Sequence, residues 1–160
     1  MPRLAQGNQS VFRTASIRDV EKIREVAGTF FDDNSCGFNS LEERIKAKTI
    51  FLLKEKKNIL GCGIVEPSVY GSGCVLIGMF TNRVHRKKGV AKTIILHLKE
   101  WAYHHKMKPV AGCWYYNTLS RKSLESAGMI TASIGYVAIL KGKEKLLPRT
   151  GNAPGELVTD

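Results

Sequence analysis

The sequence predicts an α/β domain of the α+β type, in which helices pack on a single sheet. Three observations support this class. Residues 49–67, "TIFLLKEKKNILGCGIVEP", have the pattern of two strands joined by a polar turn. Residues 74–81, "CVLIGMFT", are apolar at nearly every position, which is typical of a central strand covered on both faces. After Gly89 the apolar residues change to helical spacing, at Ala91, Ile95, Leu98 and Ala102.

Local signals place the elements of the first half. Residues 11–14, "VFRT", are expected to open a strand. Ser16 can cap a helix that runs to about Thr29. Ser40 is followed three residues later by Glu43, which is a capping box and predicts a short second helix over "LEERIKAK". The hairpin of residues 49–67 comes next.

The second half continues with a long helix from Gly89 to about Lys106. Residues 110–116, "VAGCWYY", are predicted to form the next strand, and residues 117–128, "NTLSRKSLESAG", a short helix ended by its glycine. Residues 130–140, "ITASIGYVAIL", are expected to hold a final strand. We therefore predict a polar N-terminal tail at residues 1–10, one domain at residues 11–140 and a C-terminal tail at residues 141–160.

Composition narrows the class of protein. The chain of 160 residues is long enough for one domain with a substantial core. No apolar run approaches the roughly 18 residues of a membrane span, and the N-terminus lacks the apolar stretch of a secretory signal. The four scattered cysteines predict reduced thiols in a cytoplasmic protein, with no metal site. The net charge of +11 predicts a polyanionic partner, either nucleic acid or a phosphate-rich small molecule.

The stretch "HRKKGVAK", residues 85–92, places three basic residues directly before a glycine, between the apolar strand and the long helix. Backbone N–H groups in the first turn of a helix have no intrahelical acceptor, and the helix dipole makes this end positive. Gly89 allows phosphate oxygens to come close to the backbone. Neither a P-loop nor G-x-G-x-x-G is present. Alone, the stretch fits a phosphate site and an ordinary turn equally well.

Two short motifs favour the phosphate site. "RKKGVA" at residues 86–91 resembles the Q/R-x-x-G-x-G/A signature of the GNAT superfamily of acyl-CoA-dependent N-acyltransferases. "NTLS" at residues 117–120, followed by "GM" at 128–129, resembles the N-x-x-A/S and G-F segment of the same family. The order of the expected elements also agrees, over roughly residues 11–140. The resemblance implies a mixed, mostly antiparallel sheet of six to seven strands with about four helices, splayed at a cofactor cleft.

The resemblance further implies acetyl-CoA (coenzyme A) as the cofactor. Its pyrophosphate would lie on the amides of the basic loop, and its pantetheine arm would pair with the central strand like an extra strand. The Asn that opens the short helix would contact the pantetheine or adenylyl portion. The cofactor-binding residues implied in this way are Met79, Phe80, Thr81, Arg86, Lys87, Lys88, Gly89, Val90, Ala91, Lys92, Asn117 and Ser120.

The match is weaker for catalysis. The usual acid of the family is a tyrosine seven residues after the Asn, and here that position is Leu124, which cannot donate a proton. Tyr115 would share a strand face with Asn117 and is the substitute acid we expect, although a packed core tyrosine is the alternative. Glu66, at the end of an apolar strand, is the expected base, and a solvated charge at a strand end is the alternative.

The predicted function is transfer of an acetyl group from acetyl-CoA to a primary amine, on a small molecule or a peptide, by direct attack in a ternary complex. Two alternatives remain open from the sequence. One is a regulatory module that binds acyl-CoA without turnover, and the other is a basic nucleic-acid-binding domain. The spread of the basic residues and the absence of an RNP-like strand argue against nucleic acid. A membrane partner is not expected, and a homodimer is left open.

Overall fold

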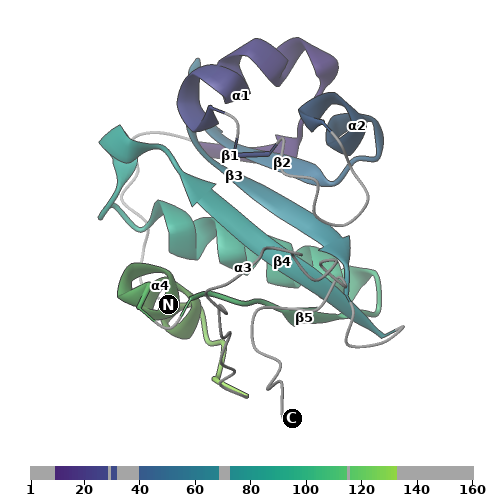
Figure 1. The fold of residues 1–160 in the computed structure, drawn as a ribbon, viewed down its shortest axis with the longest axis vertical. Helices are drawn as coiled ribbons and strands as arrows, with labels where there is room; N and C mark the ends of the chain where they lie inside the picture. The colour runs from purple at the N-terminus through teal and green to yellow at the C-terminus, as the bar shows by residue number, and fades with distance from the viewer. Residues whose placement is uncertain (1–9, 29, 32–39, 69–72, 115, 133–160) are drawn as a thin grey trace, which may run out of the picture.

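The computed structural model describes residues 10–28, 30–31, 40–68, 73–114 and 116–132. It contains an α/β fold in which helices cover both faces of one sheet (Figure 1). The strands are β1 (Ser10–Thr14), β2 (Ile50–Glu55), β3 (Asn58–Pro67), β4 (Cys74–Thr81) and β5 (Lys108–Val110). The helices are α1 (Val20–Ala27), α2 (Leu41–Lys46), α3 (Val90–His104) and α4 (Thr118–Ser126), with short 3-10 turns η1 (Ile17–Asp19) and η3 (Arg83–His85).

The sheet follows chain order, β1-β2-β3-β4-β5. Neighbouring strands are antiparallel from β1 to β4, whereas β5 runs parallel to β4 after the crossover through α3. The prediction of a mixed, mostly antiparallel sheet is therefore confirmed. The described residues contribute five strands rather than six to seven. The predicted last strand lies outside the described residues from position 133 onward, and residues 130–132 form no strand.

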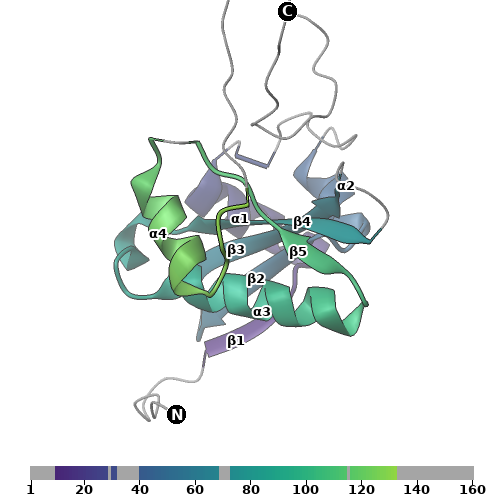
Figure 2. The same cartoon turned by 90° about the horizontal axis from the view of Figure 1, so that it is seen from below.

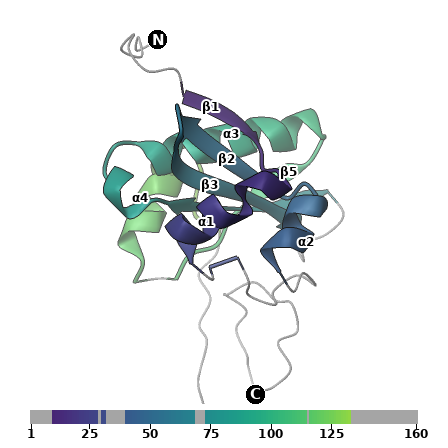
Figure 3. The ribbon, with the colours of Figure 1, turned by 90° about the horizontal axis from the view of Figure 1, so that it is seen from above.

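Two apolar clusters hold the layers together on opposite faces of the sheet. Figures 2 and 3 show α3 and α4 on one face and α1 and α2 on the other. The first cluster joins the sheet to α3 and α4 through buried residues that include Phe51, Val75, Ile77, Ile94, Leu98 and Ala127. The second joins the sheet to α1 and α2 through buried residues that include Ile23, Leu41, Ile45, Leu52 and Cys62. The two faces of each strand therefore belong to separate cores.

Local hydrogen bonds confirm the predicted helix starts. The Ser40 hydroxyl accepts a hydrogen bond from the Glu43 amide at 3.2 Å, so this capping position begins α2. The Asn117 side chain accepts from the Ser120 amide at 3.1 Å and begins α4. Ser16 and Asp19 form a capping box, although it begins the η1 turn that precedes α1.

Two glycines on β3 bring α3 close to the sheet. A Cβ atom on Gly63 would lie 3.1 Å from side-chain carbons of Ile94 and Leu98. A Cβ atom on Gly61 would lie 2.8 Å from Ile94 Cδ1 and 2.5 Å from the Phe80 carbonyl oxygen. A larger residue at either position would push the helix away from the strand. These glycines therefore set where the N-terminal half of α3 lies.

The predicted strand over residues 110–116 is wrong in its extent. β5 covers only Lys108–Val110, and residues 111–114 have no regular structure. The reason is pairing: the last partners of β4 and β5 are Leu76 and Val110, so the chain beyond Val110 has no neighbouring strand to extend against in the described residues. Figure 1 shows the chain leaving β4 after this point and turning toward α4.

None of the helices in the described ranges combines the length and the apolar character that crossing a bilayer requires.

Candidate functional site

The first feature of the site is an open edge on β4. On one side β4 pairs with β3 along its length, from Val75 to Thr81. On the other side it pairs with β5 only as far as Leu76. From Ile77 onward, no strand of the described chain lies against this edge. An exposed row of backbone donors and acceptors is a template for an extended ligand.

The direction of the backbone groups on this edge follows from two hydrogen bonds. The Lys108 amide donates to the Gly73 carbonyl at 2.8 Å, and the Asn82 amide donates to the Leu60 carbonyl at 2.9 Å. N–H and C=O groups alternate along a strand, so the odd-numbered residues of β4 face the β5 side and the even-numbered ones face β3. The open edge therefore presents the backbone groups of Ile77, Met79 and Thr81. The backbone of Phe80 points toward β3, opposite Cys62.

The open edge leads into the basic loop and the start of α3. Gly89 is the N-cap of α3 and has φ +78°, a left-handed conformation that favours glycine. Lys87 also has a positive φ, of 61°, while Lys88 between them does not. Alternation of this kind turns successive amides toward one side, which forms an anion-binding concavity. The prediction that Gly89 begins the long helix is confirmed.

The amides of this loop have no hydrogen-bond partner among the described residues. The first intrahelical bond runs from the Thr93 amide to the Gly89 carbonyl at 3.0 Å. No protein acceptor lies within hydrogen-bond reach of the amides of residues 87–92 in the described chain. A Cβ atom on Gly89 would meet no atom within 4 Å, so the space beside this residue is open. Unpartnered N–H groups at the positive end of a helix are suited to a phosphate.

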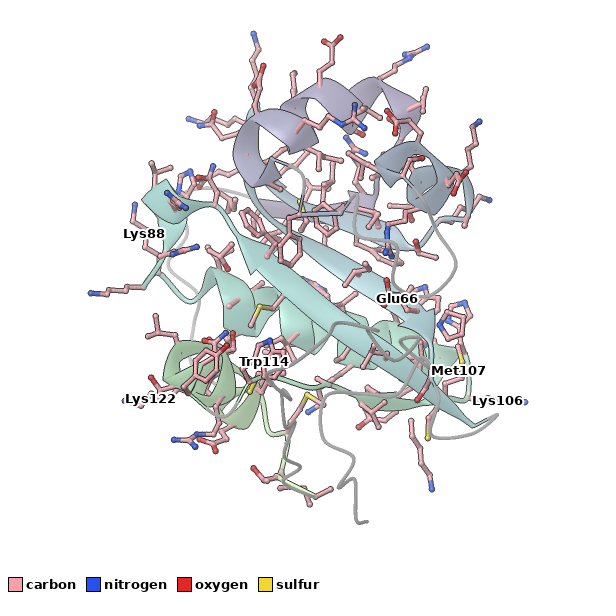
Figure 4. All side chains as sticks on the ribbon, viewed as in Figure 1. Glu66, Lys88, Lys106, Met107, Trp114 and Lys122 are labelled. Carbon is pink, nitrogen blue, oxygen red and sulfur yellow. The ribbon has the colours of Figure 1, made fainter. Side chains whose placement is uncertain are left out.

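Basic side chains surround the loop amides. Arg86, Lys87, Lys88 and Lys92 are all exposed, and no carboxylate of the described chain lies within ion-pair distance of them. Figure 4 shows Lys88 on the connection between β4 and α3, at the end of β4 that the open edge leads to. Their charge is therefore available to an anionic ligand.

Asn82 holds the loop to the sheet and was missed in the sequence. Its side-chain oxygen accepts from the Val84 amide at 3.3 Å, and its side-chain nitrogen donates to the Ile59 carbonyl at 3.1 Å. It therefore fixes the turn η3 against the start of β3. An Asn directly after an apolar strand is typical of a turn or a cap, and this signal was available in the sequence.

Thr81 supplies a buried polar group without a partner. Its Oγ1 atom is the one fully buried side-chain N or O in the described residues that makes no hydrogen bond. As an odd-numbered residue of β4, its side chain shares the face of Val75 and Ile77, which is the α3 face. Thr81 lies opposite Gly61, whose Cβ position is 3.2 Å from Val90 at the start of α3. The hydroxyl therefore lies beneath the helix N-terminus.

Glu66 is buried and paired, not solvated. Its side chain is 9% exposed and forms an ion pair with Arg44 of α2, whose side chain is 2% exposed. Arg44 also donates through Nε to the Phe31 carbonyl at 3.0 Å. Glu66 is in register with Leu76 of β4, the residue at which β5 departs. The carboxylate thus lies at the head of the open edge, and Figure 4 shows it at the far end of the sheet from Lys88.

The remaining predicted site residues belong to α4 and to the segment that precedes it. Asn117 is exposed, and its side-chain oxygen caps α4, which leaves the side-chain NH₂ as a donor. Leu124 is partly buried and packs against the cluster under α3, so an apolar side chain fills the position of the usual family acid. Tyr115 lies outside the described residues. Its neighbours Trp114 and Tyr116 are exposed and stacked at 6.1 Å, and Figure 4 shows Trp114 beside α4 on the side toward β4.

Other reactive groups are poorly placed for chemistry. Burial raises the pKa of the Cys62 thiol to about 12, with a smaller contribution from Asp19, so the thiolate is absent at neutral pH. The hydrogen bond from Arg13 holds the pKa of Asp19 well below its usual range and makes this carboxylate part of the structure. No three His, Cys, Asp or Glu residues within the described ranges gather into a group that could hold a metal ion.

Comparisons with known proteins agree with this geometry. The profile of the acetyltransferase (GNAT) family matches residues 17–129. A search of curated proteins finds no match. Among solved structures, the chain is similar to a GNAT-family acetyltransferase from Colwellia psychrerythraea, with 19% identity and a TM-score of 0.59 over 79% of this chain. The chain spans only 48% of that protein's length.

Two further structures are similar over nearly their whole length. One is yncA, a putative acetyltransferase from Salmonella typhimurium solved with its cofactor acetyl-CoA (17% identity, TM-score 0.63, covering 84% of this chain and 87% of that one). The other is AAC(6')-Iy in complex with the bisubstrate analogue CoA-S-monomethyl-acetylneamine (18% identity, TM-score 0.64, covering 84% and 99%). At these identities the structures establish the fold. The match to the family profile over most of the sequence shows that this chain belongs to the acetyltransferase (GNAT) family.

Proposed function

We propose that this protein is an N-acetyltransferase that transfers an acetyl group from acetyl-CoA to a primary amine in a ternary complex. The observation that most supports the proposal is that two sets of backbone groups without hydrogen-bond partners in the described residues follow one another along the chain. The open edge of β4, at Ile77, Met79 and Thr81, leads directly into the unpartnered amides of the loop that begins α3. An extended arm that ends in a pyrophosphate has the chemistry to satisfy both surfaces at once.

The residues present fit this group. The open space in front of Gly89 leaves room for a pyrophosphate on the loop amides, and the exposed Arg86 and Lys88 add positive charge. The edge of β4 from Leu76 to Thr81 spans roughly 17 Å at the usual strand rise, which is a distance suited to an extended arm. Asn117 retains donor hydrogens for the same ligand. The acetyl-CoA and CoA complexes of the similar structures support this assignment.

The thioester supplies an activated acetyl group when acetyl-CoA is bound. The backbone N–H groups of the β4 edge would be available as donors to its carbonyl oxygen, and donors of this kind stabilise the charge that develops on such an oxygen. The amine must lose a proton, and Glu66 at the head of the edge is the carboxylate we assign to this role, through water. The ion pair with Arg44 fixes that carboxylate in position.

A second function is favoured by one observation. Leu124 fills the position of the usual acid and packs into the core, so the chain lacks that proton donor. A regulatory module that binds acyl-CoA without turnover has no need of one. Isothermal titration with acetyl-CoA tests the binding site shared by both functions, with a random RNA as the comparison for a nucleic-acid partner. Release of free thiol over a panel of amines then separates the enzyme from the module.

The charges around the loop are expected to contribute modestly to binding. Arg86→Ala and Lys88→Ala each remove an exposed charge directed at the phosphates but leave the backbone amides in place. Exposed charge pairs contribute about 0.2–1 kcal/mol, so each variant should weaken acetyl-CoA binding by a factor of about 1.4 to 5. Titration calorimetry at low and high salt measures this, and the difference should shrink as salt rises.

The control for this prediction is Lys46→Ala. Lys46 is an exposed lysine on α2, on the other face of the sheet, and its loss changes the net charge equally. If Lys46→Ala weakens binding as much as Lys88→Ala, the effect is one of overall charge and the loop has no specific role.

Tyr115 is the proton donor we propose for the departing thiolate. Tyr115→Phe removes only the hydroxyl, so turnover should fall at least roughly tenfold while the affinity for acetyl-CoA stays the same, because acid catalysis typically contributes about a hundredfold. Steady-state thiol release measures the rate, and titration measures the affinity. Tyr116→Phe, at an exposed neighbouring tyrosine, is the matched control. Full activity in Tyr115→Phe would assign proton delivery to solvent.

We further place this activity in the cytoplasm, since the described cysteines Cys62, Cys74 and Cys113 form no disulfide.

A further inference from the structure

The two faces of β4 differ in burial at the start of the open edge. On the α3 face, the side chains of Val75 and Ile77 are buried beneath α3 in the first apolar cluster. On the opposite face, Leu76, Gly78 and Phe80 are half-buried. At this end of the open edge the α1–α2 face of β4 is therefore the more open one, and a second substrate has room to approach there.

An aromatic shelf borders this approach. Phe30, just after α1, is 54% exposed, and its ring lies 5.2 Å from that of Phe80 on β4. The buried ring of Phe31 packs edge-on against Phe30 at 5.0 Å and supports it from below. We define the aromatic shelf as Phe30 and Phe80. Two neighbouring aromatic side chains that are held in place and partly open to solvent offer a flat apolar surface that a ligand can cover.

The carboxylate that β3 places on this face already has a cationic partner. Glu66 is engaged by the guanidinium of Arg44. The chain as a whole has a net charge of +11, which repels a multiply charged amine at long range. An acceptor with one amino group and a flat apolar body gains contact with the shelf and avoids this repulsion.

We infer that the acceptor is a primary amine attached to an aromatic or similarly flat apolar group, and that Phe30 and Phe80 bind this group. The inference rests on the proposed acetyltransferase function. In the reaction, the amine nitrogen forms a bond to the carbonyl carbon of the thioester, the carbon–sulfur bond breaks, and the proton lost by the amine passes to base while the sulfur leaves as thiolate. The shelf contributes binding and orientation to this step.

The test measures the binding of phenethylamine to the protein saturated with CoA, with spermidine as the polycationic comparison. We expect phenethylamine to bind at least tenfold more tightly than spermidine. Phe30→Ala should weaken phenethylamine binding about tenfold, because it removes much of the apolar contact, and should leave CoA binding unchanged. Phe30 is exposed, so this variant is expected to fold. Tyr103→Ala, at an aromatic residue 60% exposed on α3, is the matched control and should change neither affinity.

Two results would overturn the inference while leaving the proposed function in place. One is tighter binding or faster acetylation of spermidine than of phenethylamine by a protein that binds acetyl-CoA. The other is an equal affinity for phenethylamine in Phe30→Ala and the parent. Failure of the protein to bind acetyl-CoA at all would instead remove the proposed function, and the inference with it.

Discussion

Gly89→Val is expected to abolish acetyl-CoA binding while the protein remains folded. Gly89 has φ +78°, and a Cβ atom there would meet no atom within 4 Å. Valine disfavours this φ, so the loop would have to change its backbone conformation, and the amides would no longer be held for a phosphate. A hydrogen bond to a charged group is worth about 1.5–3 kcal/mol, so losing two lowers the affinity by roughly a hundredfold or more. Titration calorimetry with acetyl-CoA measures this.

Gly28→Val is the matched control. Gly28 also has a positive φ, of 57°, and a Cβ atom there would meet no atom within 4 Å. It follows α1, on the opposite face of the sheet from α3. Its φ of 57° and ψ of −131° lie outside the left-handed helical region that Gly89 occupies at φ 78° and ψ 1°, so valine should strain the backbone at Gly28 at least as much, without touching the loop amides. Gly28→Val should therefore lose at least as much stability as Gly89→Val in urea unfolding, but only Gly89→Val should lose binding. An unchanged affinity in Gly89→Val would mean that coenzyme A does not bind at this loop.

Arg44→Met is expected to cause the largest loss of stability. The substitution leaves the Glu66 carboxylate buried without its guanidinium and removes the donor to the Phe31 carbonyl. Breaking a buried ion pair by removing one partner costs about 3–5 kcal/mol, because the remaining charge stays buried without the opposite charge it was paired with. Urea unfolding followed by circular dichroism should show the free energy of unfolding falling by this amount. Adding Glu66→Gln to Arg44→Met should restore part of it, since the amide carries no charge.

Arg24→Met separates the effect of burial from the loss of an arginine. Arg24 on α1 forms an exposed ion pair with Glu42 at 3.1 Å, and its side chain is 45% exposed. Pairs of this kind contribute at most about 1 kcal/mol, so this variant should remain close to the parent. If Arg44→Met unfolds at the same urea concentration as Arg24→Met, the pairing of Arg44 with Glu66 does not hold α2 to β3.

Features that depend on neighbours in the sequence could be predicted. The caps at Ser40 and Asn117 each accept a hydrogen bond from an amide three residues later, so residue types at fixed spacing are enough to find them. The hairpin of β2 and β3 and the apolar β4 follow from alternation and apolar runs. The start of α3 at Gly89 follows from the change of spacing that begins there.

The extent of β5 could not be predicted from its own residues. "VAGCWYY" has the composition of a strand, yet only Lys108–Val110 pairs with β4. A strand needs a neighbour for its backbone hydrogen bonds, and the divergence of the chain from β4 removes that neighbour after Val110. The same divergence creates the open edge of β4. Strand propensity therefore could not predict this edge, although it is the feature that most supports the proposed function. The family resemblance, not the periodicity, predicted the splay.

The sequence by itself determined the order of elements, the helix caps and the basic glycine loop, because each depends on contacts within one turn or one hairpin. Only the tertiary structure decided the partner of Glu66, which had been expected to act as a base or as a solvated charge. Its partner Arg44 lies 22 residues earlier, on another element. The aromatic shelf of Phe30 and Phe80 likewise joins the end of α1 to β4. Such pairs form only when the layers pack together. The spacing of residues within one element does not determine which faces of different elements will be in contact.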